Sequence, residues 1–313
     1  MLDNLVLSIN IVLPLLLVMV VGYLARGANL VADKTVTQMN NLVFRIFLPV
    51  MLMNNIRGAQ LGSLDGMSVL IFAVAVLMLV FLVAMAIVPK FVKEDARRGV
   101  VVQALFRSNY AIFGMAVIAS MYPGEALTIP SLMTTATVPF YSAFAVICLE
   151  AFRGGKANAR ALAIKVLRNP LVIGCAAGIV LLAVGNPVPT FLDKTFKDLG
   201  GVATTVALFV LGASFKLEAV RGNGKALLVT SALKLAVIPL IVLLPAIALG
   251  YRTQALASLM IALGGPVAVS SFTMAQQMDA DADLAGQLVI TTTLMSVASM
   301  FLFIFAFKML GLV

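Results

Sequence analysis

Two polar interruptions lie in a chain that is otherwise almost continuously apolar. The first reads Phe106-Arg-Ser-Asn-Tyr-Ala-Ile-Phe-Gly114, and the second reads Leu263-Gly-Gly-Pro-Val-Ala-Val-Ser-Ser271. In hydrocarbon an unwound segment persists only where it is buried in protein or lines a polar cavity, because each unsatisfied backbone group costs several kcal/mol. The interruptions are about half the chain apart, which is typical of carriers whose central site is built from two discontinuous helices.

The first interruption supplies side chains that could bind an anion. Arg107, Ser108, Asn109 and Tyr110 are consecutive, so a continuous helix would send some of them towards lipid, whereas an unwound segment lets them converge. A charged residue at this depth usually faces a cavity or a partner, which makes Arg107 a candidate counter-charge for an anion. Alternatively, it extends to the membrane interface. The amide of Asn109 offers two donors and one acceptor, either to a substrate or to a neighbouring helix.

The second interruption combines helix-breaking residues with hydroxyls. Gly264 and Gly265 carry no side chain, and Pro266 lacks a backbone donor and obstructs the preceding turn. A half-helix that begins near Pro266 would expose free N–H groups and the positive end of its dipole, which favours a carboxylate or phosphate. Ser270 and Ser271 follow one turn later. A simple proline kink is the alternative.

Further polar residues in apolar surroundings are candidates for coupling or structural support. They are Asn54, Thr134, Thr135, Thr291 and Thr292. The two threonine pairs stand at the same separation as the two interruptions, which suggests an internal repeat.

Two more charged residues, Glu150 and Lys234, fall inside apolar stretches. Each lies a turn or two from the expected end of its stretch. We therefore expect their charged groups to reach the interface, with the aliphatic stems in the membrane.

The composition predicts an all-α protein that crosses the membrane several times. Hydrophobic residues make up 62% of the 313, charged residues only 11%, and the mean hydropathy is +1.10. No soluble domain of this length could solvate such a chain. Apolar runs of spanning length predict ten transmembrane helices. Their approximate ranges are 4–25, 36–56, 67–89, 97–121, 126–152, 164–184, 196–215, 226–248, 253–277 and 284–310.

The distribution of basic residues predicts the orientation. Of the 22 Lys and Arg residues, fourteen lie in the connections after the odd-numbered spans and five lie on the other side, which includes both termini. Cytoplasmic connections carry the excess, so both termini should face away from the cytoplasm of a cell membrane. The net charge of +9 is explained by these connections rather than by nucleic-acid binding.

Several kinds of chemistry find no support. The chain has no His and only two cysteines, Cys148 and Cys175, without a CxxC motif. A metal site, a cofactor and a disulfide framework are therefore not expected. No two acids lie at matched depth, so an intramembrane enzyme is also not expected.

The layout predicts two inverted repeats of five spans, residues 1–155 and 156–313. Five is an odd number, so the second copy enters the membrane in the opposite sense. The broken fourth and ninth spans would then cross at the midplane of the bilayer.

Short motifs in a fixed order resemble the auxin efflux carriers, a family that includes plant PIN proteins and bacterial homologues often described as malonate or malate permeases. Phe47-Leu-Pro49 looks like the Leu-Pro motif of the second span, and Asn109 to Gly114 looks like the Asn-x-x-x-x-Gly segment of the fourth. Gly264-Gly-Pro266 and Ala275-Gln-Gln277 are similar to the ninth span and the segment after it. Ala116 and Ser271 stand where members of the family have proline, which argues against a plant-hormone substrate.

The resemblance implies a scaffold of spans one, two, six and seven, and a transport domain of spans three to five and eight to ten. It also implies elevator-like alternating access and a homodimer. We therefore predict a secondary transporter of small organic anions, such as malonate or malate. No nucleotide-binding motif is present, and coupling to H⁺ or Na⁺ stays open. A sodium symporter of the bile-acid type and a membrane sensor are the alternatives.

Overall fold

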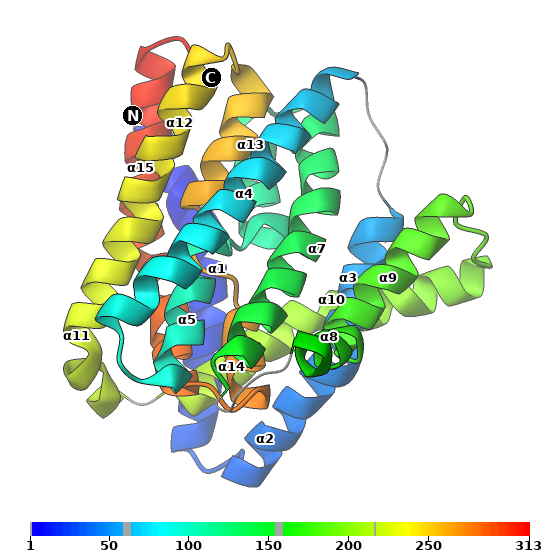
Figure 1. Ribbon diagram of the computed structural model, residues 1–313, viewed down its shortest axis with the longest axis vertical. Coiled ribbons are helices and arrows are strands. Elements are labelled where there is room, and N and C mark those ends of the chain that lie inside the picture. The colour runs from blue at the N-terminus through cyan, green and yellow to red at the C-terminus, as the bar shows by residue number, and fades with distance from the viewer. Residues whose placement is uncertain (1, 59–63, 154–158, 216) are drawn as a thin grey trace.

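The computed structural model describes residues 2–58, 64–153, 159–215 and 217–313. This part of the chain is almost entirely helical, and both of its ends lie at the top of the molecule in Figure 1. The first half contains α1 (Leu2–Gly27), α2 (Asp33–Leu42), η1 (Val43–Phe47), α3 (Leu48–Arg57), α4 (Leu64–Phe91), α5 (Asp95–Phe106), η2 (Tyr110–Gly114), α6 (Met115–Met121) and α7 (Thr128–Ala151). The second half contains α8 (Ala159–Leu167), α9 (Pro170–Ala183), α10 (Thr190–Ser214), α11 (Leu217–Ala232), η3 (Leu233–Val237), α12 (Ile238–Ala248), α13 (Thr253–Gly264), α14 (Ser270–Gln277) and α15 (Ala282–Met309). The three η elements are π-helical.

Within these ranges, six helical stretches are long and apolar enough to cross a membrane. They are Asp33–Arg57, Gly66–Phe91, Thr128–Ala151, Thr190–Ser214, Gly222–Ala248 and Ala282–Met309. Four shorter apolar helices accompany them, namely Leu13–Gly27, Tyr110–Met121, Pro170–Ala183 and Thr253–Gly264. The prediction of an all-α, multi-pass membrane protein is thereby confirmed.

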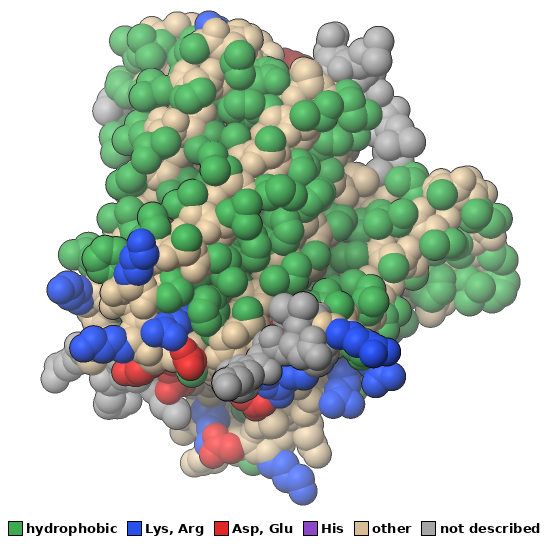
Figure 2. All heavy atoms as spheres, in the orientation of Figure 1, with side chains coloured by type: hydrophobic (Ala, Val, Ile, Leu, Met, Phe, Trp, Pro, Cys, Tyr) green, Lys and Arg blue, Asp and Glu red, His purple; other side chains and the backbone are tan. Residues whose placement is uncertain are grey.

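The surface supports the same conclusion. Figure 2 shows an almost continuous apolar face over α4, α7 and α12, where Leu79, Leu82, Ile241 and Leu244 are each more than half exposed. An apolar surface of this extent is suited to lipid rather than to water. Most of the charged side chains in the same view gather at the end of the molecule opposite the chain termini.

Helices α1, α3, α9 and α10 form one packed group, and glycine allows its closest crossings. A Cβ atom added to Gly22 of α1 would lie 2.1 Å from the carbonyl oxygen of Phe209 of α10. A Cβ atom added to Gly212 of α10 would lie 1.9 Å from the carbonyl oxygen of Met19. The two backbones therefore touch in a way that no larger residue permits.

The crossing of α9 over α3 follows the same rule. A Cβ atom on Gly174 would lie 2.5 Å from the carbonyl oxygen of Pro49, and one on Gly178 would lie 2.9 Å from that of Met53. Small residues four apart on α9 thus form the face that meets α3.

A buried arginine ties the end of α3 to the start of α10. Arg57 pairs with Asp193 at 2.8 Å, and its Nε donates to Asn54 Oδ1 at 2.9 Å. Asn54 in turn donates to the carbonyl of Phe196 at 2.5 Å. The polar groups of this cluster satisfy one another, so its role is to hold the helices of this group together.

The remaining long helices form a second group, α4, α5 and α7 together with α11 to α15. Phe81 of α4 stacks on Phe144 of α7 with ring centroids 4.5 Å apart, and Phe106 at the end of α5 meets both rings edge-on. The two groups meet where α1 packs on α15 and α3 packs on α7.

Candidate functional site

Both predicted helix interruptions are confirmed. Helix α5 ends at Phe106 and η2 begins at Tyr110, while α13 ends at Gly264 and α14 begins at Ser270. The second half-helix was expected to begin near Pro266 and instead begins four residues later. The expected start was wrong because the intervening residues form an extended segment that pairs with the other interruption.

The two unwound segments cross and bond to each other. The N–H of Asn109 donates to the carbonyl of Pro266 at 2.8 Å, and Ser108 and Val267 form an isolated antiparallel bridge. The N–H of Val267 donates to Thr292 Oγ1 at 3.0 Å. Backbone groups that the helices release are therefore satisfied by the crossing itself, as burial in a membrane protein requires.

Glycines make the crossing possible. A Cβ atom on Gly264 would lie 2.8 Å from Pro239, and one on Gly265 would lie 2.5 Å from the carbonyl oxygen of Ile261. A Cβ atom on Gly114 would lie 2.9 Å from the side chain of Ile261. These three predicted site residues, like Pro266, shape the crossing and do not line the pocket described next.

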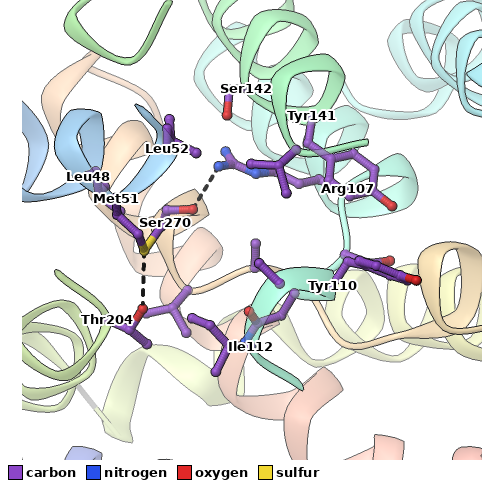
Figure 3. A pocket seen from close by; sticks show the side chains of 16 residues that line it. Leu48, Met51, Leu52, Arg107, Tyr110, Ile112, Tyr141, Ser142, Thr204 and Ser270 are labelled. Atoms are coloured by element: carbon purple, nitrogen blue, oxygen red, sulfur yellow. Dashed lines mark hydrogen bonds between the residues drawn. The ribbon is translucent and has the colours of Figure 1, made fainter. Parts of the chain in front are cut away.

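A pocket adjoins the crossing, and the roughly 450 Å³ of empty space within it includes open solvent. Its walls come from α3 and α10 of the first group, and from α7 and both interruptions of the second. The lining residues are Leu48, Met51, Leu52, Arg107, Ser108, Asn109, Tyr110, Ala111, Ile112, Val138, Tyr141, Ser142, Thr204, Ala268, Val269 and Ser270. Figure 3 shows that Arg107 points across this space towards Ser270.

Arg107 is the charged group of the pocket. Its side chain is buried, with only 4% of the residue exposed, so it does not extend to the membrane interface. Its Nη2 donates to Ser270 Oγ at 2.7 Å and its Nη1 donates to Gln103 Oε1 at 3.0 Å. No carboxylate among the described side chains forms an ion pair with it, so its charge lacks a protein counter-charge there.

Asn109 contributes the second polar group. It lines the pocket, yet its side-chain amide makes no hydrogen bond to any residue in the described part of the chain. Its amide atoms are not among the fully enclosed polar atoms that lack a partner in the described residues, so they stay accessible from the pocket. The amide is therefore available to a molecule in the pocket.

Lys234 lies deeper in the protein than its sequence context predicts. It was expected to reach the interface, but it is fully buried in η3 and its Nζ donates to Ser108 Oγ at 2.7 Å. The expectation was wrong because Lys234 lies at the middle of the apolar stretch Gly222–Ala248, too deep for its stem to reach water. The central position of Lys234 in this apolar stretch could have indicated a buried lysine near the site. Glu150, in contrast, lies near the charged end, where it pairs with Arg153 and Lys165, each at 2.9 Å.

The other predicted residues lie at varying distances from the pocket. Thr292 supports the second interruption, whereas Thr134 and Thr135 donate to carbonyls one turn earlier in their own helix. Thr291 is half-buried beside Thr292 on α15, and Asn54 belongs to the Arg57 cluster.

Ser271 is buried outside the lining, where its carbonyl accepts a hydrogen bond from Gln103 at 3.4 Å. Its neighbour Ser270 is therefore the serine of this pair that reaches the pocket.

Sequence reasoning missed the walls that come from elsewhere in the chain. Tyr141 and Ser142 of α7 lie outside both interruptions, and Thr204 of α10 was visible only as a polar residue in an apolar helix. Leu48 is the leucine of the Leu-Pro motif and Met51 lies two residues after its proline, but nothing in their chemistry predicts that they face a pocket. Among the described residues, no group of three or more His, Cys, Asp or Glu could hold a metal ion.

Comparison of the chain with models of known protein families matches residues 7–304 to the family described as membrane transport protein. No curated protein sequence matches the chain. The family match covers nearly the whole sequence, including both interruptions. The chain therefore belongs to the membrane transport protein family of auxin efflux carriers, and it is a multi-pass membrane transporter.

Proposed function

We propose that the protein is a secondary transporter of small organic anions, mono- or dicarboxylates such as malonate or malate, and that it binds them in the pocket at the crossing. The observation that carries this proposal is the pairing of Arg107, a buried cation without a protein carboxylate, with the unpartnered amide of Asn109. Both side chains line the same space. A carboxylate would supply the counter-charge that the guanidinium lacks and the acceptor that the amide lacks.

The rest of the lining fits a small organic anion. Ser270 places a hydroxyl beside the guanidinium, and Thr204 and Ser142 add hydroxyls on other walls. Leu48, Leu52, Ile112 and Val138 supply apolar surface for a short carbon chain. A few polar groups that fix orientation within mostly apolar walls are typical of small-molecule sites.

The packing supports ten spans arranged as two inverted repeats. Helix α1 packs on α10, which would be the counterpart of the second span, and α3 packs on α9, which would be the counterpart of the first. Each of the first two spans thus packs on the repeat of its neighbour. Helix α4 packs on α5 as α12 packs on α13, and α4 packs on α7 as α11 packs on α15. The repeats would comprise residues 1–155 and 156–313, of which 1, 59–63, 154–158 and 216 lie outside the described residues.

The position of the pocket suits an elevator. Its walls come partly from α3 and α10, which would form the scaffold with α1, α2 and α9, and partly from the second group, which would move. Movement of the second group relative to the first would carry Arg107, Asn109 and Ser270 together across the membrane, because all three belong to that group. The substrate would then leave the α3 and α10 walls behind.

The charged end of the molecule would face the cytoplasm. The cation-rich connections lie there, opposite both ends of the chain in Figures 1 and 2. Three of the fourteen basic residues counted in these connections have side chains outside the described part of the chain, namely Lys156, Lys216 and Arg221. With this orientation both termini are outside the cytoplasm of a cell membrane.

Uptake into proteoliposomes tests the proposed function. Labelled acetate, lactate, malonate and malate would be compared with neutral malonamide, with and without imposed Na⁺ and pH gradients. We expect saturable uptake of at least one carboxylate and none of malonamide, and loss of that uptake in Arg107→Gln. Uptake of the neutral compound at the same rate, or full activity without the Arg107 charge, would contradict the proposal.

A further inference from the structure

Lys234 places a second buried cation against the crossing, on a different side from the pocket. It is 0% exposed, its Nζ bonds to Ser108, and Ser108 lines the pocket while Lys234 does not. A single hydroxyl therefore separates this lysine from the space in which the substrate would bind. The function proposed above gives it no role.

The surroundings of Lys234 contain no counter-charge in the described part of the chain. The element η3 packs against α5, α11, α12, α13 and α15. Helices α12 and α13 carry no charged residue, and the middle of α15 near Thr292 and Ser296 is neutral. The charged residues with described side chains on these elements are Asp95, Arg97 and Arg98 near the start of α5, Arg107 after its end, Lys225 in α11, and Asp283 and Lys308 near the two ends of α15. None of these acids forms an ion pair with Lys234.

The hydrogen bond between Lys234 and Ser108 can form in both protonation states of the lysine. As an ammonium, Lys234 donates to Ser108 Oγ, and the Ser108 hydroxyl donates to the carbonyl of Ala262 at 2.6 Å. The same carbonyl also accepts from the hydroxyl of Tyr141 at 2.7 Å. When the amine is neutral, the Ser108 hydroxyl can turn to donate to Nζ, and the Ala262 carbonyl keeps its bond from Tyr141. The bond between Lys234 and Ser108 is therefore kept in both states, with its direction reversed.

We propose that Lys234 is the proton-binding site of the transporter and that it takes up one proton when an anion binds in the pocket. This inference rests on the proposed function. The amine, R–NH₂, gains H⁺ from the aqueous side to which the pocket is open and becomes R–NH₃⁺, and it returns H⁺ when the anion leaves on the other side. The anion and proton then cross together, so the protein is a proton-coupled symporter.

The physical basis is electrostatic linkage between two nearby sites. Desolvation disfavours a buried ammonium that has no counter-charge, and an anion one hydroxyl away offsets that cost. By reciprocity, the protonated lysine must raise the affinity for the anion by the same factor that the anion raises the affinity for the proton. His, the commonest proton-carrying residue at neutral pH, does not occur in this chain.

Proton uptake on malonate binding is the direct test, measured with purified protein by calorimetry in buffers of different ionisation enthalpy. Malonate stays a dianion across about pH 7 to 10, a range that reaches the usual titration region of lysine. We expect the unmodified protein to take up as much as one proton per malonate, and its Kd to rise by up to tenfold per pH unit where Lys234 loses its proton. Lys234→Met should show weaker binding with no proton uptake and no such slope.

Two further variants separate titration from packing. Lys234→Arg keeps a permanent charge, so it should bind malonate with a Kd that does not vary with pH and without proton uptake. Lys225→Met removes an exposed lysine of α11 and should match the unmodified protein. Malonate binding by the unmodified protein without proton uptake, or an unchanged slope in Lys234→Met, would overturn this inference and leave the proposed function standing. Failure of acetate, lactate, malonate and malate alike to bind would overturn both.

Discussion

Replacing Asn109 by alanine removes one of the two groups on which the proposed anion site depends. The amide makes no hydrogen bond to a described residue, so its removal leaves no buried partner unsatisfied. The backbone N–H of Asn109, which bonds to Pro266, is retained in alanine. We therefore expect Asn109→Ala to fold as well as the unmodified protein.

The expected loss falls on binding. A hydrogen bond to a charged group contributes about 1.5–3 kcal/mol, which corresponds to a Kd for malonate that is roughly tenfold to a hundredfold weaker. The lower end applies if a water molecule enters and replaces the amide. The upper end applies if the site stays dry, because the carboxylate would then lose the bond without compensation.

Equilibrium binding of labelled malonate to purified protein measures this effect, with thermal unfolding as the check on folding. Ser120→Ala is a matched control, since that exposed hydroxyl donates to Ala116 of its own helix and lies outside the pocket. An unchanged Kd in well-folded Asn109→Ala would remove Asn109 from the site. An equal loss in Ser120→Ala would show that the effect does not arise in the pocket.

Three further predictions follow from the same structure. Ser270→Asp should abolish malonate uptake, because the new carboxylate would pair with Arg107. Ser270→Asn, which is similar in size, should retain part of the uptake. Equal uptake by the two variants would show that charge at this position does not matter. Gly212→Ala should lower the thermal unfolding temperature sharply, because the new Cβ atom would lie 1.9 Å from the carbonyl oxygen of Met19. Gly201→Ala on the same helix is the control. Its Cβ atom would meet nothing within 4 Å, so the unfolding temperature should stay unchanged or rise slightly. A C-terminal fusion to green fluorescent protein should be dark and one to alkaline phosphatase active, and the reverse result would contradict the proposed orientation.

The sequence predicted the helix breaks well because their chemistry is local. Gly264, Gly265 and Pro266 disfavour a continuous helix wherever they stand, and polar residues at 107–109 cannot remain in lipid. The place where the second half-helix resumes was not predictable, because Val267 pairs with Ser108 across the crossing. That contact joins residues from opposite halves of the chain.

The walls of the site were harder to predict for the same reason. Met51 and Ile112 are apolar residues in apolar helices, and only the packing of the two helix groups brings them to one pocket. Lys234 was mispredicted for a different reason. Its position inside an apolar stretch was visible in the sequence, but the distance from its charged group to the membrane interface was underestimated. The crossing that gives it a partner, Ser108, exists only in the folded protein.

The most direct test of the central claim is a crystal structure of the protein with bromomalonate, whose bromine is located by its anomalous scattering. We expect one strong anomalous peak in the pocket, with the carboxylates within hydrogen-bond distance of the Arg107 guanidinium and the Asn109 amide. A peak elsewhere in the molecule, at a concentration that saturates binding, would contradict the assignment of the substrate site to the crossing of the two broken helices.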